Sequence, residues 1–556
     1  TGLYLELLDE VTGIYFNPAR FAMNINSDKV YLFTLPITIG AEVNYRYLQI
    51  NDGVVNEVNS RNQPVLSRKL IVDGPVLVQD TVFGWTNLFY QGATGRISGQ
   101  LIDGGNQAPI PDMLISTTGM TTTSSSDGTF ILENVPVGTH NLVILSKEGS
   151  YIPFQQYATI SQGATTPILL KLTKRETVKI KLVVSLRNKL DSDLPIRIAG
   201  NIASLGNRFE LLQAGSANTS NNLPQLEKES NNKYSVTLNL PAGAYIKYKY
   251  TLGDGFWDSE MGSTGSFILR ELIVPVKSGT MSDTISTFNS PEKGQIVFNT
   301  KVNAPIPSSD KLFIQFNPYD WMEPIPMVKT GENTWKFTLT SPLQLTGLIN
   351  YRYCRNGDCQ NGLSTQPSLS VTPSQDPLAV NDTIESWNGF QPKEFSPVID
   401  NGGLNLPIDP EFITGVEITS DLPSSWESSI ENGFRDVKNL GSKWVLISPT
   451  WSVSSIDPVM IEPMSSSDLS WSDTQKLISY VKLEEMDPVL YPQMHLTDSS
   501  MLSDSTAHDG GWWLIFFDRY ERFILNYADM AQIMGAKGIV IGDPLLSFTM
   551  YQGNET

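Results

Sequence analysis

Hydrophobic and polar residues alternate with a period of two in several runs within the first 390 residues. The pattern is clearest in three short runs, Tyr45-Arg46-Tyr47, Tyr248-Lys249-Tyr250 and Tyr351-Arg352-Tyr353. Alternation of this kind predicts half-buried strands, with the rings packed inward and the basic side chains in water. Turn-forming Gly, Pro, Asn and Asp residues separate many such runs. We therefore expect several all-β sandwiches of immunoglobulin-like type.

The three aromatic runs belong to an internal repeat. An Asp-Thr pair follows each of them, at Asp80-Thr81, Asp283-Thr284 and Asp382-Thr383. Tyr47 and Asp80 are 33 residues apart, as are Tyr250 and Asp283, and the third spacing is 29. Self-similarity at this scale indicates repeated domains. We assign three copies of one sandwich to residues 1–92, 174–292 and 293–392.

The copies resemble the starch-binding, family 20 type of carbohydrate-binding module. The second copy carries the resemblance in Leu205-Gly206-Asn207, in its aromatic strand and in Trp257-Asp258. Such modules stack sugars on exposed aromatic rings, which implies carbohydrate contacts at Trp257 and Asp258. Tyr319 and Trp321 in the third copy are a second candidate pair. A structural aromatic at the sandwich edge is the alternative for Trp257, Tyr319 and Trp321.

Residues 93–173 interrupt the repeat. A strand at 95–101 is followed by the turn Asp127-Gly128 and by a second turn at Pro136-Val137-Gly138. Asp-Gly favours the positive φ values of a tight hairpin. The segment resembles the regulatory-like domain of carboxypeptidases, a seven-stranded sandwich, and this resemblance implies a scaffolding role.

The pattern changes after residue 392. A linker at 393–411, rich in Pro, Gly and Asn, precedes strands that alternate with amphipathic helices, which is typical of a parallel sheet. We expect helices at Trp426–Leu440 and Trp513–Met534, and one that Ser472-Asp473 caps. Residues 412–556 are thus interpreted as the first four β/α units of a (β/α)8 barrel.

This region resembles family 113 glycoside hydrolases, in Pro449-Thr450-Trp451, Tyr527-Ala528 and Ile541-Gly542. That family has its acid/base Glu two residues after the glycine that ends strand four, where this chain has Pro544. A proline cannot transfer a proton, so Asp543 and Glu417 are left as weak catalytic candidates. The resemblance also places Trp451 and His495 in a sugar site. The catalytic residues stay unknown at this point.

Charge and composition limit the kinds of partner that the chain is expected to bind. The net charge is −19 and no basic stripe occurs, which argues against nucleic acid. There is no apolar run long enough to span a membrane and no signal peptide, and the chain starts at Thr1, so we expect a processed form or a fragment. Cys354 and Cys359 flank Asn356-Gly357, which predicts a hairpin disulfide, with free thiols as the alternative. We expect no metal site and no cofactor.

Two functions remain open. The first is a secreted or cell-surface carbohydrate-active protein that binds polysaccharide through its modules. The second is a non-catalytic structural subunit of an extracellular assembly, which Pro544, Arg208 and Asn56 favour because they stand at positions expected for functional residues. A half-barrel exposes a parallel edge. Further chain, a partner subunit, or a homo-oligomer or filament contact is expected to cover that edge.

Overall fold

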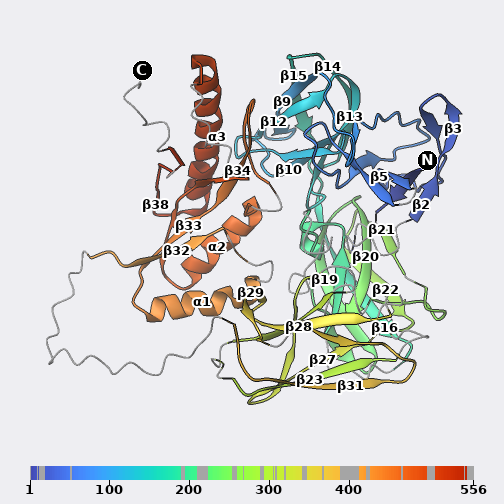
Figure 1. The fold of residues 1–556 in the computed structure, drawn as a ribbon, viewed down its shortest axis with the longest axis vertical. Helices are drawn as coiled ribbons and strands as arrows, with labels where there is room; N and C mark the ends of the chain where they lie inside the picture. The colour runs from blue at the N-terminus through green and yellow to red at the C-terminus, as the bar shows by residue number, and fades with distance from the viewer. Residues whose placement is uncertain are drawn as a thin grey trace. The chain divides into compact units, whose positions relative to one another are not determined.

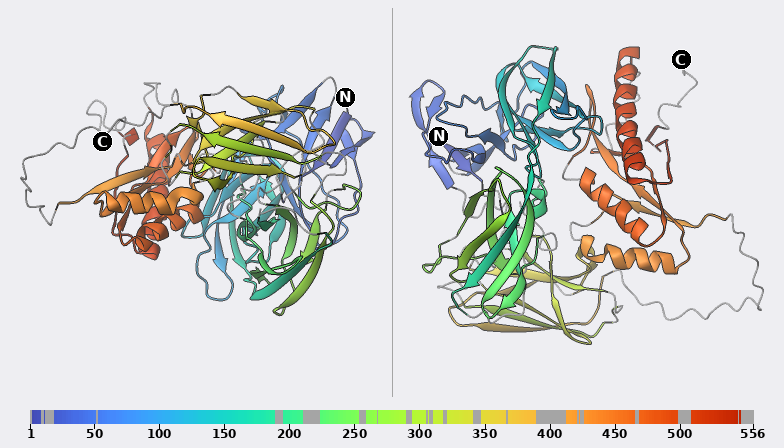
Figure 2. Two further views of the ribbon diagram at one scale, coloured as in Figure 1. Left: turned by 90° about the horizontal axis from the view of Figure 1, so that it is seen from below. Right: turned by 180° about the vertical axis from the view of Figure 1, so that it is seen from behind.

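The chain is built mainly from β-strands arranged in several sheets (Figure 1). Its described residues contain three α-helices, all of them after residue 426. Both views of Figure 2 show strands through the blue-to-yellow part of the chain and helices in the orange and red part. The computed structural model describes all residues except 1, 9–10, 12–18, 51–52, 189–194, 210–222, 253–258, 267, 289–293, 305, 307–309, 318–320, 341–346, 366–367, 389–411, 421, 423–425, 465–467, 498–507, 544 and 547–556.

The inserted segment forms a seven-stranded sandwich. One sheet has the order β11-β10-β13-β14 and the other β12-β9-β15, in which β15 runs parallel to β9. Inward-facing apolar side chains of both sheets, such as Ile97, Phe130 and Ile144, share one fully buried core. The strands are β9 (Thr94–Asp103), β10 (Met113–Thr117), β11 (Met120–Thr123), β12 (Thr129–Pro136), β13 (Gly138–Ser146), β14 (Phe154–Ile160) and β15 (Thr165–Leu172).

The second copy of the repeat is also a sandwich. Its sheets have the orders β18-β19-β16-β22 and β17-β20-β21, and β16 and β22 are parallel. Apolar residues at every second position of β16 fill the core together with Tyr250 of β20. The strands are β16 (Thr177–Leu186), β17 (Ile196–Gly200), β18 (Glu227–Ser230), β19 (Lys233–Pro241), β20 (Tyr245–Leu252), β21 (Arg270–Ile273) and β22 (Gly279–Ile285).

The third copy repeats this topology. Its first sheet has the order β26-β27-β23-β31, with β23 parallel to β31. Its second sheet has the order β25-β24-β28-β29, and β30 also pairs with β28. The ring of Phe298 on β23 lies 4.9 Å from that of Tyr351 on β28, so the two sheets pack through aromatics. The strands are β23 (Ile296–Val302), β24 (Leu312–Asn317), β25 (Ile325–Pro326), β26 (Val328–Gly331), β27 (Thr334–Leu339), β28 (Ile349–Arg355), β29 (Asp358–Leu363), β30 (Leu369–Val371) and β31 (Leu378–Ile384).

The first copy differs from the other two. Its described strands form one six-stranded sheet around β5, together with a separate β3–β4 hairpin, and the stretch that carries Asp80 is not in a strand. Two-sheet sandwiches are therefore seen in the second and third copies, whereas the sheet strands of the first form a single sheet. The strands are β1 (Gly2–Leu7), β2 (Ala19–Ala22), β3 (Asn24–Ser27), β4 (Val30–Leu32), β5 (Glu42–Ile50), β6 (Val54–Val58), β7 (Arg68–Ile71) and β8 (Gly84–Trp85).

The C-terminal region contains a parallel sheet with the order β32-β33-β36-β38. These strands follow one another along the chain with α1, α2 and α3 between them, as the alternating pattern predicts. A smaller sheet, β35-β34-β37, uses residues that directly follow β33 and β36. The elements are β32 (Gly415–Thr419), α1 (Glu427–Asn439), β33 (Trp444–Ser448), β34 (Thr450–Ile456), β35 (Val459–Glu462), α2 (Trp471–Leu483), β36 (Asp487–Leu490), β37 (Gln493–Leu496), α3 (Gly510–Met534) and β38 (Gly538–Ile539).

The protein divides into two compact units, and residues of the C-terminal region belong to both of them. The first unit comprises residues 1–288, 454–466 and 510–526, and the second comprises the remaining residues. Within the first unit, Arg519 binds Glu133 at 2.8 Å and Arg61 binds Glu462 at 2.6 Å. Residues 412–556 are therefore not a single compact unit, because two of their segments pack with residues of the first two modules.

Two local predictions are wrong. Ser470, not Ser472, caps α2, since its hydroxyl accepts the backbone N–H of Asp473 at 3.1 Å. The basic residues of the aromatic strands do not all face water. Lys249 is 3% exposed, and the guanidinium of Arg352 lies 4.0 Å from the ring centre of Trp321.

Candidate functional site

The most regular polar arrangement in the protein is a carboxylate that accepts hydrogen bonds from two tyrosines. In the second copy, the hydroxyls of Tyr248 and Tyr250 donate to the same oxygen, Oδ2 of Asp283, at 2.9 and 2.7 Å. In the third copy, Tyr351 and Tyr353 donate to Oδ2 of Asp382 at 2.9 and 2.7 Å. We call this arrangement the tyrosine–aspartate node.

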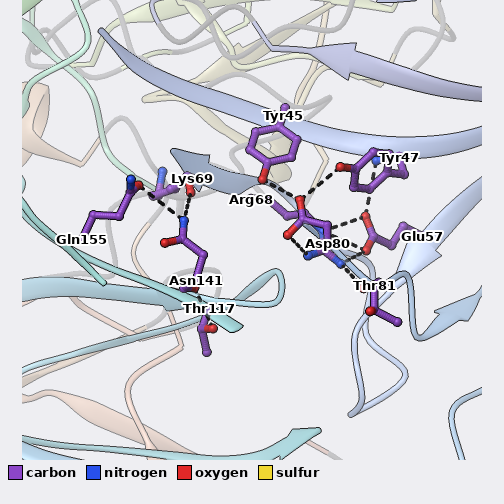
Figure 3. Close-up of polar contacts among 10 residues, drawn as sticks. All are labelled: Tyr45, Tyr47, Glu57, Arg68, Lys69, Asp80, Thr81, Thr117, Asn141 and Gln155. Atoms are coloured by element: carbon purple, nitrogen blue, oxygen red, sulfur yellow. Dashed lines mark hydrogen bonds and ion pairs between the residues drawn. The ribbon is translucent and has the colours of Figure 1, made fainter. Parts of the chain in front are cut away.

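The first copy has the same node. Tyr45 and Tyr47 donate to Oδ2 of Asp80 at 2.6 and 3.0 Å, and Figure 3 shows both hydroxyls directed at that carboxylate. The two rings of each node meet edge to face, with centroid distances of 5.8 to 5.9 Å. The repeat seen in the sequence is thus a repeat of one hydrogen-bonded group.

Strand topology explains why these residues meet. In the second copy the tyrosines lie on β20 and Asp283 lies on β22, which belong to opposite sheets of the sandwich. The third copy places its tyrosines on β28 and Asp382 on β31, again in opposite sheets. The node therefore joins the two sheets of each sandwich through side chains, where no backbone ladder can do so.

An arginine and a glutamate extend the node in the first two copies. Arg68 binds Asp80 Oδ1 at 3.2 Å and the carbonyl of Thr81 at 2.8 Å, and it pairs with Glu57 (Figure 3). Glu57 also accepts the backbone N–H of Tyr47 at 3.3 Å.

The second copy repeats these contacts closely. Arg270 binds Asp283 Oδ1 at 3.1 Å and the carbonyl of Thr284 at 2.8 Å, and it pairs with Glu260 at 2.8 Å. Glu260 accepts the N–H of Tyr250 at 3.1 Å. Charge pairing and hydrogen bonding together offset the cost of burying these groups.

The environment keeps the node tyrosines neutral. Burial raises the pKa of Tyr250 far above the ordinary value for a phenol, and the negative charge of Asp283 raises it further. Burial and the Asp382 carboxylate act in the same way on the pKa of Tyr353. Burial also raises the pKa of Glu57, against the opposing effect of Arg68. A phenol held neutral and already bound to a carboxylate is a poor nucleophile or base, so the node is a structural group.

The first copy also contacts the inserted sandwich through side-chain amides. Gln155 accepts the N–H of Ile71 at 2.8 Å and donates to its carbonyl at 3.1 Å, which satisfies both backbone groups at the free edge of β7. Asn141 lies beside Gln155 and donates to the carbonyl of Lys69 at 3.4 Å (Figure 3). An exposed strand edge is protected in this way.

The carbohydrate-binding candidates of the sandwiches are only partly described. Trp257, Asp258 and Tyr319 lie outside the described residues. Trp321 is half-buried and stacks on Arg352, whose Nε donates to Gln315 at 2.7 Å. One face of this indole is therefore held by a fixed cation.

The candidates of the C-terminal region lie near the carboxyl ends of the parallel strands. Asp543 is buried, and its carboxylate accepts the N–H groups of Met494 and Leu545, the latter at 2.7 Å. Burial raises its pKa, and these two N–H groups lower it. Glu417 accepts the Ser448 hydroxyl at 2.6 Å and the Gln493 amide at 3.2 Å. Both candidate carboxylates are bound to neighbouring framework groups.

The two sugar-site candidates of this region differ in exposure. Trp451 is 5% exposed and packs edge to face against Tyr527 at 6.4 Å, so its ring faces are not open. His495 is exposed on β37, and Pro544 lies outside the described residues. Asp468, which the sequence did not single out, is buried beside Trp451 and accepts Thr450 Oγ1 at 2.6 Å and Ser452 N–H at 2.9 Å.

The cysteines form the predicted pair. Cys354 and Cys359 are disulfide-bonded across the turn between β28 and β29 and are both buried. Within the described part of the chain, no cluster of three His, Cys, Asp or Glu side chains is arranged to hold a metal ion. No described helix is long and apolar enough to cross a membrane.

Sequence reasoning missed Glu57, Arg68, Glu260 and Arg270. A signal was present, because each pair is separated by 10 or 11 residues and lies between the aromatic strand and the Asp-Thr pair. Charged residues at such positions are normally exposed, so a single sequence gives little reason to place them inside.

Comparison with known proteins identifies no family. No protein-family model matches the chain, and no curated protein matches it. Among solved structures, the Bacillus anthracis TIE protein is 10% identical over 62% of this chain and 60% of its own, with a TM-score of 0.15. The major pilin subunit of Bacillus cereus is 12% identical over 53% of this chain and 99% of its own, with a TM-score of 0.14.

A third similar structure is a putative carbohydrate binding protein from Bacteroides uniformis. It is 10% identical over 33% of this chain and 97% of its own, with a TM-score of 0.13. This chain spans less than two thirds of the length of the TIE protein, and only 20% of a family 15 glucoamylase from Hypocrea jecorina. Similarities at these TM-scores carry no functional argument.

The node predicts how the protein responds to alkali. Because the folded pKa values of its tyrosines are raised, their contribution to stability is complete below about pH 10, the ordinary phenol value, and is lost as pH rises above it. The six node tyrosines should therefore ionise at a higher pH than exposed tyrosines, and only as their modules unfold. A pH titration that follows tyrosinate absorbance and circular dichroism together measures this.

The Tyr250→Phe variant tests whether a single hydroxyl of the node stabilises its module. Removing a hydroxyl bonded to a carboxylate should lower the free energy of unfolding of its module by about 1.5–3 kcal/mol. Tyr234→Phe, at a partly buried position of the same sandwich, is the control. Ionisation of the node tyrosines at the ordinary pH in a folded protein would contradict this interpretation.

Proposed function

We propose that the chain is a non-catalytic structural protein of the cell surface or an extracellular assembly, built from modules of carbohydrate-active type. Its C-terminal region is, in this proposal, a glycoside-hydrolase-like half-barrel without acid–base chemistry. The order of four parallel strands separated by helices supports the half-barrel assignment. The observation that carries the non-catalytic assignment is the bonding of Asp543.

A glycosidase needs one carboxyl group free to protonate the leaving oxygen and a second carboxylate opposite it. Asp543 instead accepts backbone N–H groups from Met494 and Leu545, one on each oxygen. A carboxylate fixed in this way by its own framework supports the loop structure rather than proton transfer. Glu417 has comparable contacts with Ser448 and Gln493.

The disulfide supports an extracellular setting. Disulfides persist mainly in oxidising compartments, such as the cell exterior and the periplasm. Cys354–Cys359 is the pairing that joins β28 to β29. The net charge of −19 would keep such an exported protein soluble and away from anionic surfaces.

A partner is also part of the proposal. Val540 and Ile541, which continue from β38, are 39% and 68% exposed. β38 stands at one end of the parallel strand order and is paired with β36 alone among the described strands. We propose that another subunit, a further copy or additional chain covers this edge in the assembly.

The hydrolysis assay tests the non-catalytic assignment. The native protein incubated with soluble β-mannan or α-glucan should release no reducing ends above a protein-free blank, and the Asp543→Asn variant should behave in the same way. If Asp543 were a general acid, its replacement would lower the rate by about 100-fold or more. Hydrolysis by the native protein that this variant lacks would overturn the proposal.

A second candidate function, polysaccharide binding, is favoured by Trp321 alone. The centre of its ring lies 4.0 Å from the guanidinium carbon of Arg352. This contact fixes the position of an aromatic ring of the kind that stacks on sugars.

If this ring binds glycan, α-glucan or mannan in an affinity gel should retard the native protein, and Trp321→Ala should abolish the retardation. Tyr157→Ala, at an aromatic 44% exposed in the inserted sandwich, is the matched control and should leave it unchanged. Equal migration of the native protein with and without glycan would exclude this candidate.

A further inference from the structure

The three copies of the node differ in one respect. The first two contain a glutamate–arginine pair whose glutamate is buried, whereas the third contains the only disulfide that two cysteines allow. The contrast lies at two positions, the residues that pair with the first and with the second node tyrosine.

The arginine position is fixed by antiparallel pairing with the first node tyrosine. Tyr45 is opposite Arg68, and Tyr248 is opposite Arg270. In the third copy Tyr351 is opposite Leu369. The side chain that donates to the node aspartate in two copies is therefore replaced by one with no donor.

The glutamate position is fixed by the second node tyrosine. The N–H of Glu260 donates to the carbonyl of Tyr250 at 2.8 Å, and the N–H of Ser364 donates to that of Tyr353 at 3.1 Å. Ser364 is 3% exposed, so it takes the same buried position as Glu260, which is fully buried. Glutamate and arginine are thus both replaced in the third copy, by serine and leucine.

The disulfide lies beside this altered pair. Cys354 directly follows Tyr353 on β28 and is opposite Leu363, the residue before Ser364. The bond to Cys359 ties β29 to β28, whereas the ion pair of the first copy links β6 to β7, both of which pair with the aromatic strand β5. A covalent link and a buried ion pair both restrict separation of these strands, although by different physical means.

We propose that the Cys354–Cys359 disulfide replaces the glutamate–arginine pair in the third sandwich and makes its stability, alone among the three copies, dependent on oxidation. A dithiol that reduces this bond supplies two electrons and two protons, becomes a disulfide itself and leaves two thiols on the protein. The third node then keeps its two tyrosines and Asp382 but has neither the covalent link nor the ion pair. Strands β28, β29 and β30 open more often.

Hydrogen exchange on the full chain, with and without dithiothreitol, tests this inference. Reduction should increase the opening equilibrium of amides in β28–β30 by about 30-fold, the value expected for a closed loop of this length. The cysteine-free copies are internal controls, so amides of β5, β7, β20 and β21 should exchange at unchanged rates. The Cys354→Ser/Cys359→Ser variant should reproduce the reduced state without reductant.

A rescue variant distinguishes replacement of the glutamate–arginine pair by the disulfide from a general loss of stability. Adding Ser364→Glu and Leu369→Arg to the cysteine-free variant should restore most of the lost protection in β28–β30. Leu369→Arg alone, in the same cysteine-free background, is the matched control and should restore less protection, because the arginine would have Asp382 as a partner but not the buried glutamate that completes the pair.

Three outcomes would overturn the inference. They are unchanged exchange in β28–β30 after complete reduction, equal acceleration in all three copies, and a rescue variant no more protected than its Leu369→Arg control.

Discussion

The sandwiches depend on one interaction, a carboxylate that accepts two tyrosine hydroxyls from the opposite sheet. Backbone ladders hold each sheet together, but only side chains can join one sheet to the other. In the second copy the node lies within a core that includes Tyr248, Tyr250 and Ile285. Because hydrogen bonds to a charged group contribute about 1.5–3 kcal/mol each, the node fixes the sheet pairing beyond what apolar contact provides.

The third copy shows that this node can be supported in two ways. Where Glu260 and Arg270 pair in the second copy, the third has Ser364 and Leu369 next to a disulfide. The tyrosine–aspartate distances stay the same to within 0.1 Å despite this change. The node itself is therefore the constant element, and its surroundings have diverged.

Much of this arrangement could be predicted from the sequence. The period-two runs located β20 and β28, the helix–strand alternation located α1, α2 and β33, and the Asn-Gly turn predicted the cysteine pair. The Asp-Thr pair marked the node without revealing that its aspartate binds the tyrosines, because that contact joins residues 33 apart in opposite sheets. Trp451 shows the same limit: its residue type suggested a sugar contact, but packing against Tyr527 buries it.

The most direct test of the node is the removal of one carboxylate, in the Asp283→Ala variant of the full chain, followed by hydrogen exchange. Breaking a buried charge network costs about 3 kcal/mol, so amides of β16, β20 and β22 should exchange about 100-fold faster while those of β23 and β28 stay unchanged. Glu271→Ala, at an exposed position on β21, should have no such effect. Exchange rates in Asp283→Ala equal to those of Glu271→Ala would contradict the account.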